Sequence, residues 1–243
     1  MKKVFFSLVA LFVFTSVFLP AQQVDLATVV ASATGFFSDI SVATIYALDG
    51  KAWALSVDER NLAIIKEYKE KKAAAQEIKN PKDRDAKVQE INAEYGTKFD
   101  AAMADMKASA NVAKVDTAKK LGNSVFCLVK AVLLDARALK NAPTIQTAIQ
   151  AALQNLPKGM AAMKYKDDIK YLKYASGLMP ELPGQLNSQV EAITVTINKV
   201  KAFAAANKID LPKTESMTAD DKVEEFNEKF YSIEDGRALA LPS

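Results

Sequence analysis

The sequence of 243 residues lacks histidine and contains one cysteine. Without histidine the chain can form neither a Ser-His-Asp triad nor a histidine-ligated zinc or haem site. A single cysteine cannot form a disulfide within the chain. Because Cys127 stands in the apolar run Val125–Val129, we expect it to be a small buried side chain, with an intermolecular disulfide as the alternative.

Arginine is scarce as well, since it occurs four times among 32 basic residues, which stand against 29 acidic ones. Arginine supplies the bidentate contacts with which proteins bind phosphates and guanine. A chain with a formal charge of +3 and so little arginine is therefore expected to have no nucleic-acid partner.

Glycine and proline occur eight times each, and alanine, lysine and leucine are the commonest residues. This composition is typical of helical proteins. We predict an all-α fold, a multi-helix bundle of about seven helices with a long antiparallel helical hairpin. The helices are expected to break at Gly50, Asn80–Pro81, Gly122, Pro143, Pro157, Pro180–Gly184 and Pro212.

The first 21 residues have the pattern of a secretory signal peptide. Lys2 and Lys3 precede an uncharged apolar stretch, residues 4–19, and Ala21 offers a small residue for cleavage. This stretch is shorter than the roughly 20 residues that span a bilayer, and a retained N-terminal anchor is the alternative. We expect a bacterial protein that is periplasmic or secreted, with no transmembrane span after cleavage.

The next segment, residues 25–48, is apolar on most sides. A transmembrane helix at this place would put Asp39 inside the bilayer, at a cost of about 3 kcal/mol. We therefore expect a buried core helix.

Residues 56–113 are predicted to form the helical hairpin. Ser56 and Glu59 have the spacing of a capping box, and Asn80 followed by Pro81 predicts the start of a second helix. Such a hairpin either packs on the bundle or projects from it. Its second helix carries one apolar stripe with steps of three and four: Val88, Ile91, Tyr95, Phe99, Ala102, Met106, Ala110 and Ala113.

Further apolar periodicities predict a central helix over about 115–140, a short helix over 144–156, and helices over 160–179 and 184–206. The run Ile193–Ile197 also fits a strand, because its residues are β-branched and alternate, but the helical period holds over six positions. Residues 22–211 would then form the bundle domain.

Residues 212–243 differ from the bundle domain. Leu211–Met217 has the composition of a linker, Thr218 is the expected start of a short amphipathic helix, and the last residues are expected to fray. The partner-binding candidates share one face of this helix, which either docks back on the bundle or binds a partner. They are Val223, Phe226 and Phe230.

The ligand-binding candidates lie where lysines alternate with tyrosines. Tyrosine rings can stack on sugars while lysines supply positive charge, although a solvated face with half-buried tyrosines fits the same pattern. The acidic runs 83–94 and 220–228 lack the spacing of a calcium loop, so we expect no metal, no cofactor and no catalytic site. The candidates are Tyr165, Lys170, Tyr171, Lys173 and Tyr174.

Residues 56–113 resemble the helical arm of the periplasmic chaperone family Skp/OmpH, since both are hairpins rich in lysine, alanine and glutamate in an exported chain. The resemblance covers this hairpin alone. It implies a holdase chaperone.

Elimination leaves a non-enzymatic structural or interaction protein that binds protein partners, or itself, through helical faces. An envelope or periplasmic filament assembly would be an example. The first alternative is a carrier that holds a small apolar or lipid ligand between its helices, with Phe36 and Phe37 lining the pocket. The second alternative is the holdase that the resemblance implies.

Overall fold

The computed structural model describes residues 25–107, 114–156 and 163–222. Helices make up 82% of these residues and strands none, which confirms the prediction of an all-α fold. The described part contains six α-helices and one short 3-10 helix. They are α1 (Leu26–Leu55), η1 (Glu59–Asn61), α2 (Leu62–Gln76), α3 (Pro81–Ala104), α4 (Lys114–Gln154), α6 (Lys166–Leu178) and α7 (Leu182–Ala206).

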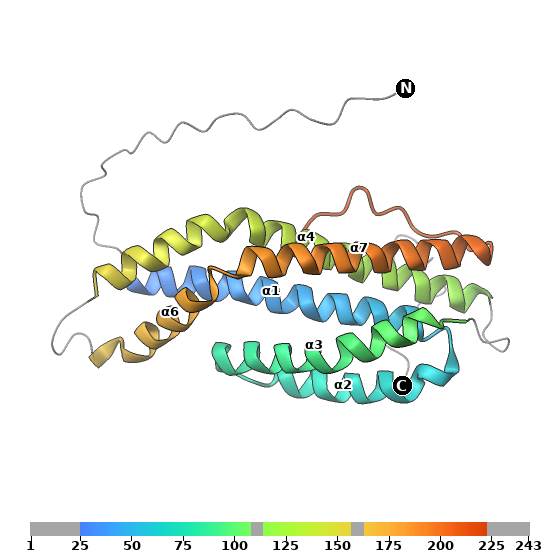
Figure 1. Cartoon of the computed structure of the whole chain (residues 1–243), viewed down its shortest axis with the longest axis horizontal. Helices are drawn as coiled ribbons and strands as arrows, with labels where there is room; N and C mark the ends of the chain where they lie inside the picture. The colour runs from blue at the N-terminus through green and yellow to red at the C-terminus, as the bar shows by residue number, and fades with distance from the viewer. Residues whose placement is uncertain (1–24, 108–113, 157–162, 223–243) are drawn as a thin grey trace, which may run out of the picture.

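Two long helices, α1 and α4, lie side by side at the centre of the bundle (Figure 1). The α2–α3 hairpin packs on α1, α7 packs on α4, and α6 contacts one end of both. The expected central helix over 115–140 is therefore the first part of α4.

The prediction of about seven helices is wrong, because α4 continues through Gly122 and Pro143 and absorbs the short helix expected over 144–156. A proline inside a helix costs about 3 kcal/mol, since it removes one backbone hydrogen bond. Ala142 and Ile149 on either side are buried in a cluster with residues of α1 and α6, and this burial joins the two parts. The helix bends between its green and yellow parts instead of ending (Figure 1).

The break predicted at Gly50 is also wrong, because α1 runs on to Leu55. A Cβ atom at Gly50 would lie 2.5 Å from the side chain of Leu128 and 3.0 Å from the carbonyl oxygen of Ser124. This glycine therefore permits α1 and α4 to approach closely, and it does not end a helix.

Two apolar clusters fill most of the bundle. The first joins the second half of α1 to α2, α3, α7 and the first half of α4. It contains three buried rings, Tyr68, Tyr95 and Phe99, whose centroids lie 5.4–5.9 Å apart. The second joins the first half of α1 to the second half of α4 and to α6.

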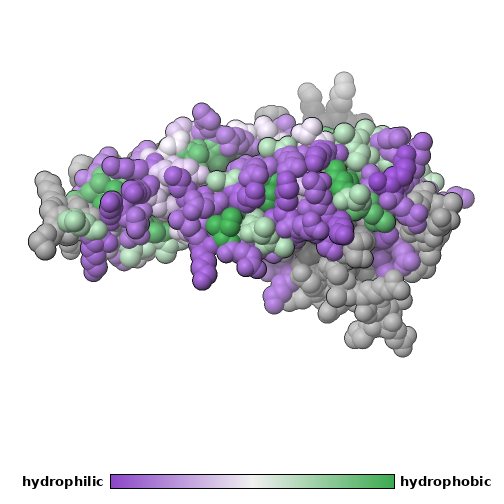
Figure 2. All heavy atoms as spheres, turned by 90° about the horizontal axis from the view of Figure 1, so that it is seen from below, coloured by the Kyte–Doolittle hydropathy of each residue, from purple (hydrophilic) through white to green (hydrophobic). Residues whose placement is uncertain are grey.

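The α2–α3 hairpin lies along α1 and does not project from the bundle (Figure 1). Its outer side is mostly hydrophilic, as Figure 2 shows from the side on which α2 and α3 lie in Figure 1. The predicted apolar stripe is buried at Val88, Ile91, Tyr95 and Phe99 and half-buried at Ala102 and Met106. Ala110 and Ala113 lie outside the described residues.

One of the two predicted helix caps is confirmed. Asn80 accepts hydrogen bonds from the amides of Lys82 and Asp83, and Pro81 occupies the first turn of α3. The capping box at Ser56 is wrong, because Ser56 ends α1 and its hydroxyl donates to the carbonyl of Trp53 at 2.7 Å.

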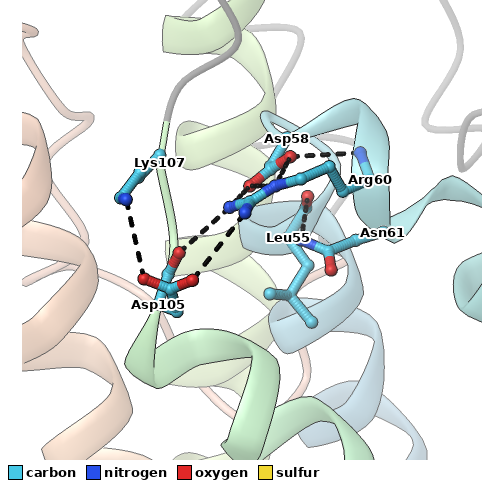
Figure 3. A network of polar contacts seen from close by, with 6 residues as sticks. All are labelled: Leu55, Asp58, Arg60, Asn61, Asp105 and Lys107. Atoms are coloured by element: carbon cyan, nitrogen blue, oxygen red, sulfur yellow. Dashed lines mark hydrogen bonds and ion pairs between the residues drawn. The ribbon is translucent and has the colours of Figure 1, made fainter.

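Asp58 is the residue that caps the hairpin, within a polar network around its first turn (Figure 3). Its carboxylate accepts hydrogen bonds from the backbone amide and the guanidinium of Arg60. The Arg60 guanidinium lowers the pKa of this buried carboxyl below its ordinary value. The same guanidinium donates to the carbonyl of Asp105, so it joins the two ends of the hairpin.

Helix α7 is helical through Ile193–Ile197, so the strand alternative for this run is wrong. The chain then reverses at Lys208, whose φ of 54° lies in the left-handed region. Residues 207–222, which we name the C-terminal strap, return over the bundle with Ile209, Pro212 and Met217 buried. The stretch expected to be a linker is thus packed against helices.

The amphipathic helix predicted from Thr218 does not begin within the strap. The backbone amide and hydroxyl of Thr218 both donate to the carboxylate of Asp221. Val223, Phe226 and Phe230 lie outside the described residues.

Helix α1 is long and apolar enough to cross a membrane, and it is the one such helix in the described part of the chain. Eighteen of its 30 residues are buried in the bundle, as the expectation of a core helix requires. The apolar start of the chain is compatible with a signal peptide and equally with a membrane anchor. The predicted signal peptide, residues 1–21, lies outside the described residues.

Candidate functional site

A groove of about 610 Å³ lies between part of α1 and the α2–α3 hairpin. Its walls come from one side of α1 and from the facing sides of α2 and α3, and α4 contributes Cys127. We name it the hairpin groove. This volume falls within the range of about 300–1,000 Å³ in which proteins hold small ligands.

The α1 wall of the hairpin groove is mostly apolar. Val42, Ile45, Tyr46 and Trp53 line it at spacings that place them along one side of the helix. Val42 is 41% exposed, one of four large hydrophobic residues that stand exposed in the described part of the chain. Together with Ile45, Tyr46 and Trp53 it forms a contiguous apolar wall, and contiguous apolar surface is a feature of binding sites.

The hairpin wall is cationic, with Lys69, Lys72 and Arg84 along its edge. Lys72 forms an ion pair with Asp49 of α1, with 2.5 Å between nitrogen and oxygen. Asp49 also accepts a hydrogen bond of 2.7 Å from the hydroxyl of Tyr68. Burial and the neighbouring Asp49 carboxylate both raise the pKa of Tyr68, so its hydroxyl stays protonated and holds the carboxylate in place.

A second polar contact ties the hairpin to α1 beside the groove. The hydroxyl of Ser41 donates to one carboxylate oxygen of Asp85 at 2.8 Å. Burial raises the pKa of Asp85, although Ser41 and Arg84 partly offset that rise. The other carboxylate oxygen is buried and has no hydrogen-bond partner among the described residues.

The hairpin groove therefore combines an apolar wall with a cationic edge. Such a surface suits a molecule with an apolar side and a negatively charged side, either an acidic amphipathic helix or an anionic amphiphile. Three or more residues able to hold a metal ion together are not found within the described residues.

The structure divides the lysine and tyrosine candidates between two environments. Tyr165 and Tyr171 are half-buried and pack against the second core cluster. The ring of Tyr174 lies 5.3 Å from the ammonium of Lys82 on α3. Lys170 and Lys173 are exposed. The five residues thus do not converge on a shared pocket.

The apolar pair expected to line a carrier pocket lies elsewhere. Phe36 and Phe37 are buried in the second core cluster, with their ring centroids 5.1 Å apart. They do not line the hairpin groove. The first half of α1, to which this pair belongs, packs against α4 and α6.

Sequence reasoning missed a carboxylate that is fully buried in the bundle. Asp135 of α4 has no exposed surface, and neither carboxylate oxygen has a hydrogen bond of good geometry among the described residues. Burial raises its pKa to about 7, and the nearby Gln189 of α7 offsets part of the rise. The sequence offered one signal for this burial, since Asp135 lies on α4 between the apolar residues Leu134 and Ala138, which are both buried.

Comparisons with known proteins add no identification. The chain matches no family model, and neither the curated proteins nor the solved structures include a match to it.

Proposed function

We propose that this chain is a non-enzymatic, exported interaction protein that binds an acidic amphipathic helix of a partner protein in the hairpin groove. The observation that carries this proposal is the exposed apolar residue Val42 on the α1 wall, opposite the cationic residues Lys69, Lys72 and Arg84. Helix-in-groove recognition uses an apolar face for affinity and charges at the edge for orientation.

Export to the bacterial periplasm is part of the proposal. It is supported by the charged start and apolar stretch of residues 1–21, which fit a cleaved signal peptide. A partner would then be an envelope or periplasmic protein, and an envelope or filament assembly is an example of where such contacts form.

A second candidate function is the binding of a single-chain anionic amphiphile, as in a carrier. The groove volume of about 610 Å³ favours it, because this is the size of a small-ligand site. The cationic edge would then hold the anionic headgroup and the α1 wall the apolar chain.

Photocrosslinking in the producing cells tests both functions. A photoreactive amino acid at Ile45, inside the groove, is expected to form an adduct whose crosslinked peptide is an acidic amphipathic helix. Val42→Glu should abolish the adduct, because it places a carboxylate on the apolar wall. Val195→Glu, at a 54% exposed position on α7, is the matched control and should leave the adduct unchanged.

The other outcomes are equally decisive. A lipid adduct that depends on Val42 would replace the protein-binding function with the carrier function. Adducts that persist in Val42→Glu, or no adduct above background, would contradict both.

A further inference from the structure

We propose that the segment 223–233 of this same chain binds in the hairpin groove in cis, as an amphipathic helix that competes with the partner. The competition with a partner rests on the proposed function. The docking of the segment in the groove stands on its own observations, which concern the place where the strap ends and the sequence of the residues after it.

The C-terminal strap contacts two side chains that line the hairpin groove. Met217 packs against Trp53 of α1 and against Phe126 and Cys127 of α4. Trp53 and Cys127 also line the hairpin groove. The strap therefore passes along the edge of the groove before the described chain ends at Lys222.

Charged contacts fix the end of the strap beside α1. The ammonium of Lys130, which is 7% exposed, donates to the carbonyl oxygens of Ala219 and Asp221. The guanidinium of Arg137 joins Asp220 of the strap to Asp39 of α1.

These contacts place the start of the following segment near the groove. Asp39 lies three residues before Val42 on α1, so the two share a side of the helix about one turn apart. Residue 223 therefore follows by three residues Asp220, which shares the Arg137 guanidinium with Asp39, the residue about one turn before Val42 on α1.

The segment has the chemistry that the groove suits. Val223, Phe226, Phe230 and Ile233 have the spacing of one face of a helix. As a helix, 223–233 would be about 15 Å long, and the α1 wall from Val42 to Trp53 measures about 16 Å at the same rise per residue.

The charges of the segment complement the cationic edge of the groove. Residues 223–235 contain five acidic residues and one lysine. The groove edge carries Lys69, Lys72 and Arg84, and it remains cationic beside the ion pairs of Lys72 with Asp49 and of Arg84 with Asp85. Opposite charges at the edge favour one orientation of the docked helix and disfavour burial of its acidic face.

Docking within one molecule is favoured over docking in a second copy. A segment tethered beside its site has an effective concentration in the millimolar range, whereas a second copy competes at its actual concentration. The contacts of Lys130 and Arg137 provide that tether.

Thiol labelling of the purified chain, starting at Gln22, tests the proposal. In a Cys127→Ala background, Val42→Cys supplies a thiol on the groove wall. We expect it to react about tenfold or more slowly in the full chain than in a chain that ends at Lys222. The truncated chain keeps all described contacts of the strap, and a synthetic peptide of residues 220–236 should restore protection.

Two matched controls separate docking from general effects. Val195→Cys on α7 should react equally in both chains, because it lies outside the groove. In the full chain, Phe226→Asp together with Phe230→Asp should remove the protection of the thiol at position 42. Ser232→Asp, on the opposite side of a helix from these rings, should leave it intact.

Three results would overturn the proposal. One is an equal labelling rate at position 42 in the full and truncated chains. Another is protection that survives Phe226→Asp with Phe230→Asp. The third is protection lost on dilution from about 100 to about 1 µM, which would assign the groove to a second copy. None of these depends on a partner, so failure here is distinct from failure of the crosslinking experiment.

Discussion

The two sides of α1 are packed in different ways. The side that faces α4 carries small or apolar residues with steps of three and four, and all of them are buried: Ala33, Phe36, Ile40, Ala43, Ala47, Gly50 and Ala54. The side that faces the hairpin carries Ser38, Ser41, Val42 and Asp49 and borders a groove of about 610 Å³.

The difference comes from side-chain size and charge. Short side chains on α1 allow Leu128 of α4 to pack directly against the backbone at Gly50, so no space is left between these helices. On the other side, lysine and arginine of the hairpin line the edge of the groove. The contacts Ser41–Asp85 and Asp49–Lys72 join α1 to the hairpin beside this groove.

The comparison shows that one helix can have a closely packed side and a side that borders a groove. The hairpin packs on α1 through a buried apolar cluster, but beside that cluster polar contacts border a groove in which Val42 remains exposed. Three sets of variants test this difference, starting with the largest expected effect.

The largest effect is expected where a titratable group lies among the packed helices. Asp135 holds its proton up to about pH 7 in the folded chain, but its ordinary pKa is 3.8. Between these values the folded state binds more protons, so the free energy of unfolding falls as the pH rises. We expect a total loss of about 4 kcal/mol, measured by urea unfolding from pH 4 to pH 8.

Asp135→Asn is the control for that pH dependence. The neutral amide has nearly the same shape, so this variant should lose most of the pH dependence over the same interval, and the smaller part that remains belongs to Asp85, whose pKa is also raised by burial. A wild-type pH dependence in Asp135→Asn would show that another group is responsible.

The next largest change in the free energy of unfolding is expected at two glycines of α1. Gly50→Ala should lower the free energy of unfolding by about 1–3 kcal/mol, because the new Cβ atom overlaps Leu128. Gly35→Ala should instead raise it by about 0.5–1 kcal/mol, because nothing lies within 4 Å and alanine is the better helix former. Guanidinium unfolding measures both, and equal signs would mean that α1 and α4 are not in close contact at Gly50.

The smallest effect concerns the polar contacts on the hairpin side. Tyr68→Phe removes the hydroxyl that donates to Asp49 and should cost about 1 kcal/mol. Lys71→Gln removes a more exposed ion pair with Glu94 and should cost less than about 0.5 kcal/mol. If the second variant is the more damaging one, exposed charges and not buried contacts hold the hairpin.

Sequence reasoning identified most helices but misplaced several of their ends. Asn80 with Pro81 was recognised because a cap depends on residues within one turn. Ser56 was misassigned because the same residue type also ends helices, and whether it begins or ends one depends on where α1 stops. The candidates at Tyr165, Tyr171 and Tyr174 were chosen for composition, which does not reveal that they face different neighbours.

The sequence by itself determined the all-α class, the apolar stripe of α3 and the cap at its start, because periodicity and capping act over a few residues. Only the tertiary structure decided that α4 continues through Pro143, that Gly50 is an interhelical contact, and that Asp135 is buried. It also decided that the hairpin packs on α1 and leaves a groove beside part of it. These outcomes depend on which helix covers which side of another, and contacts between residues far apart in the chain decide that.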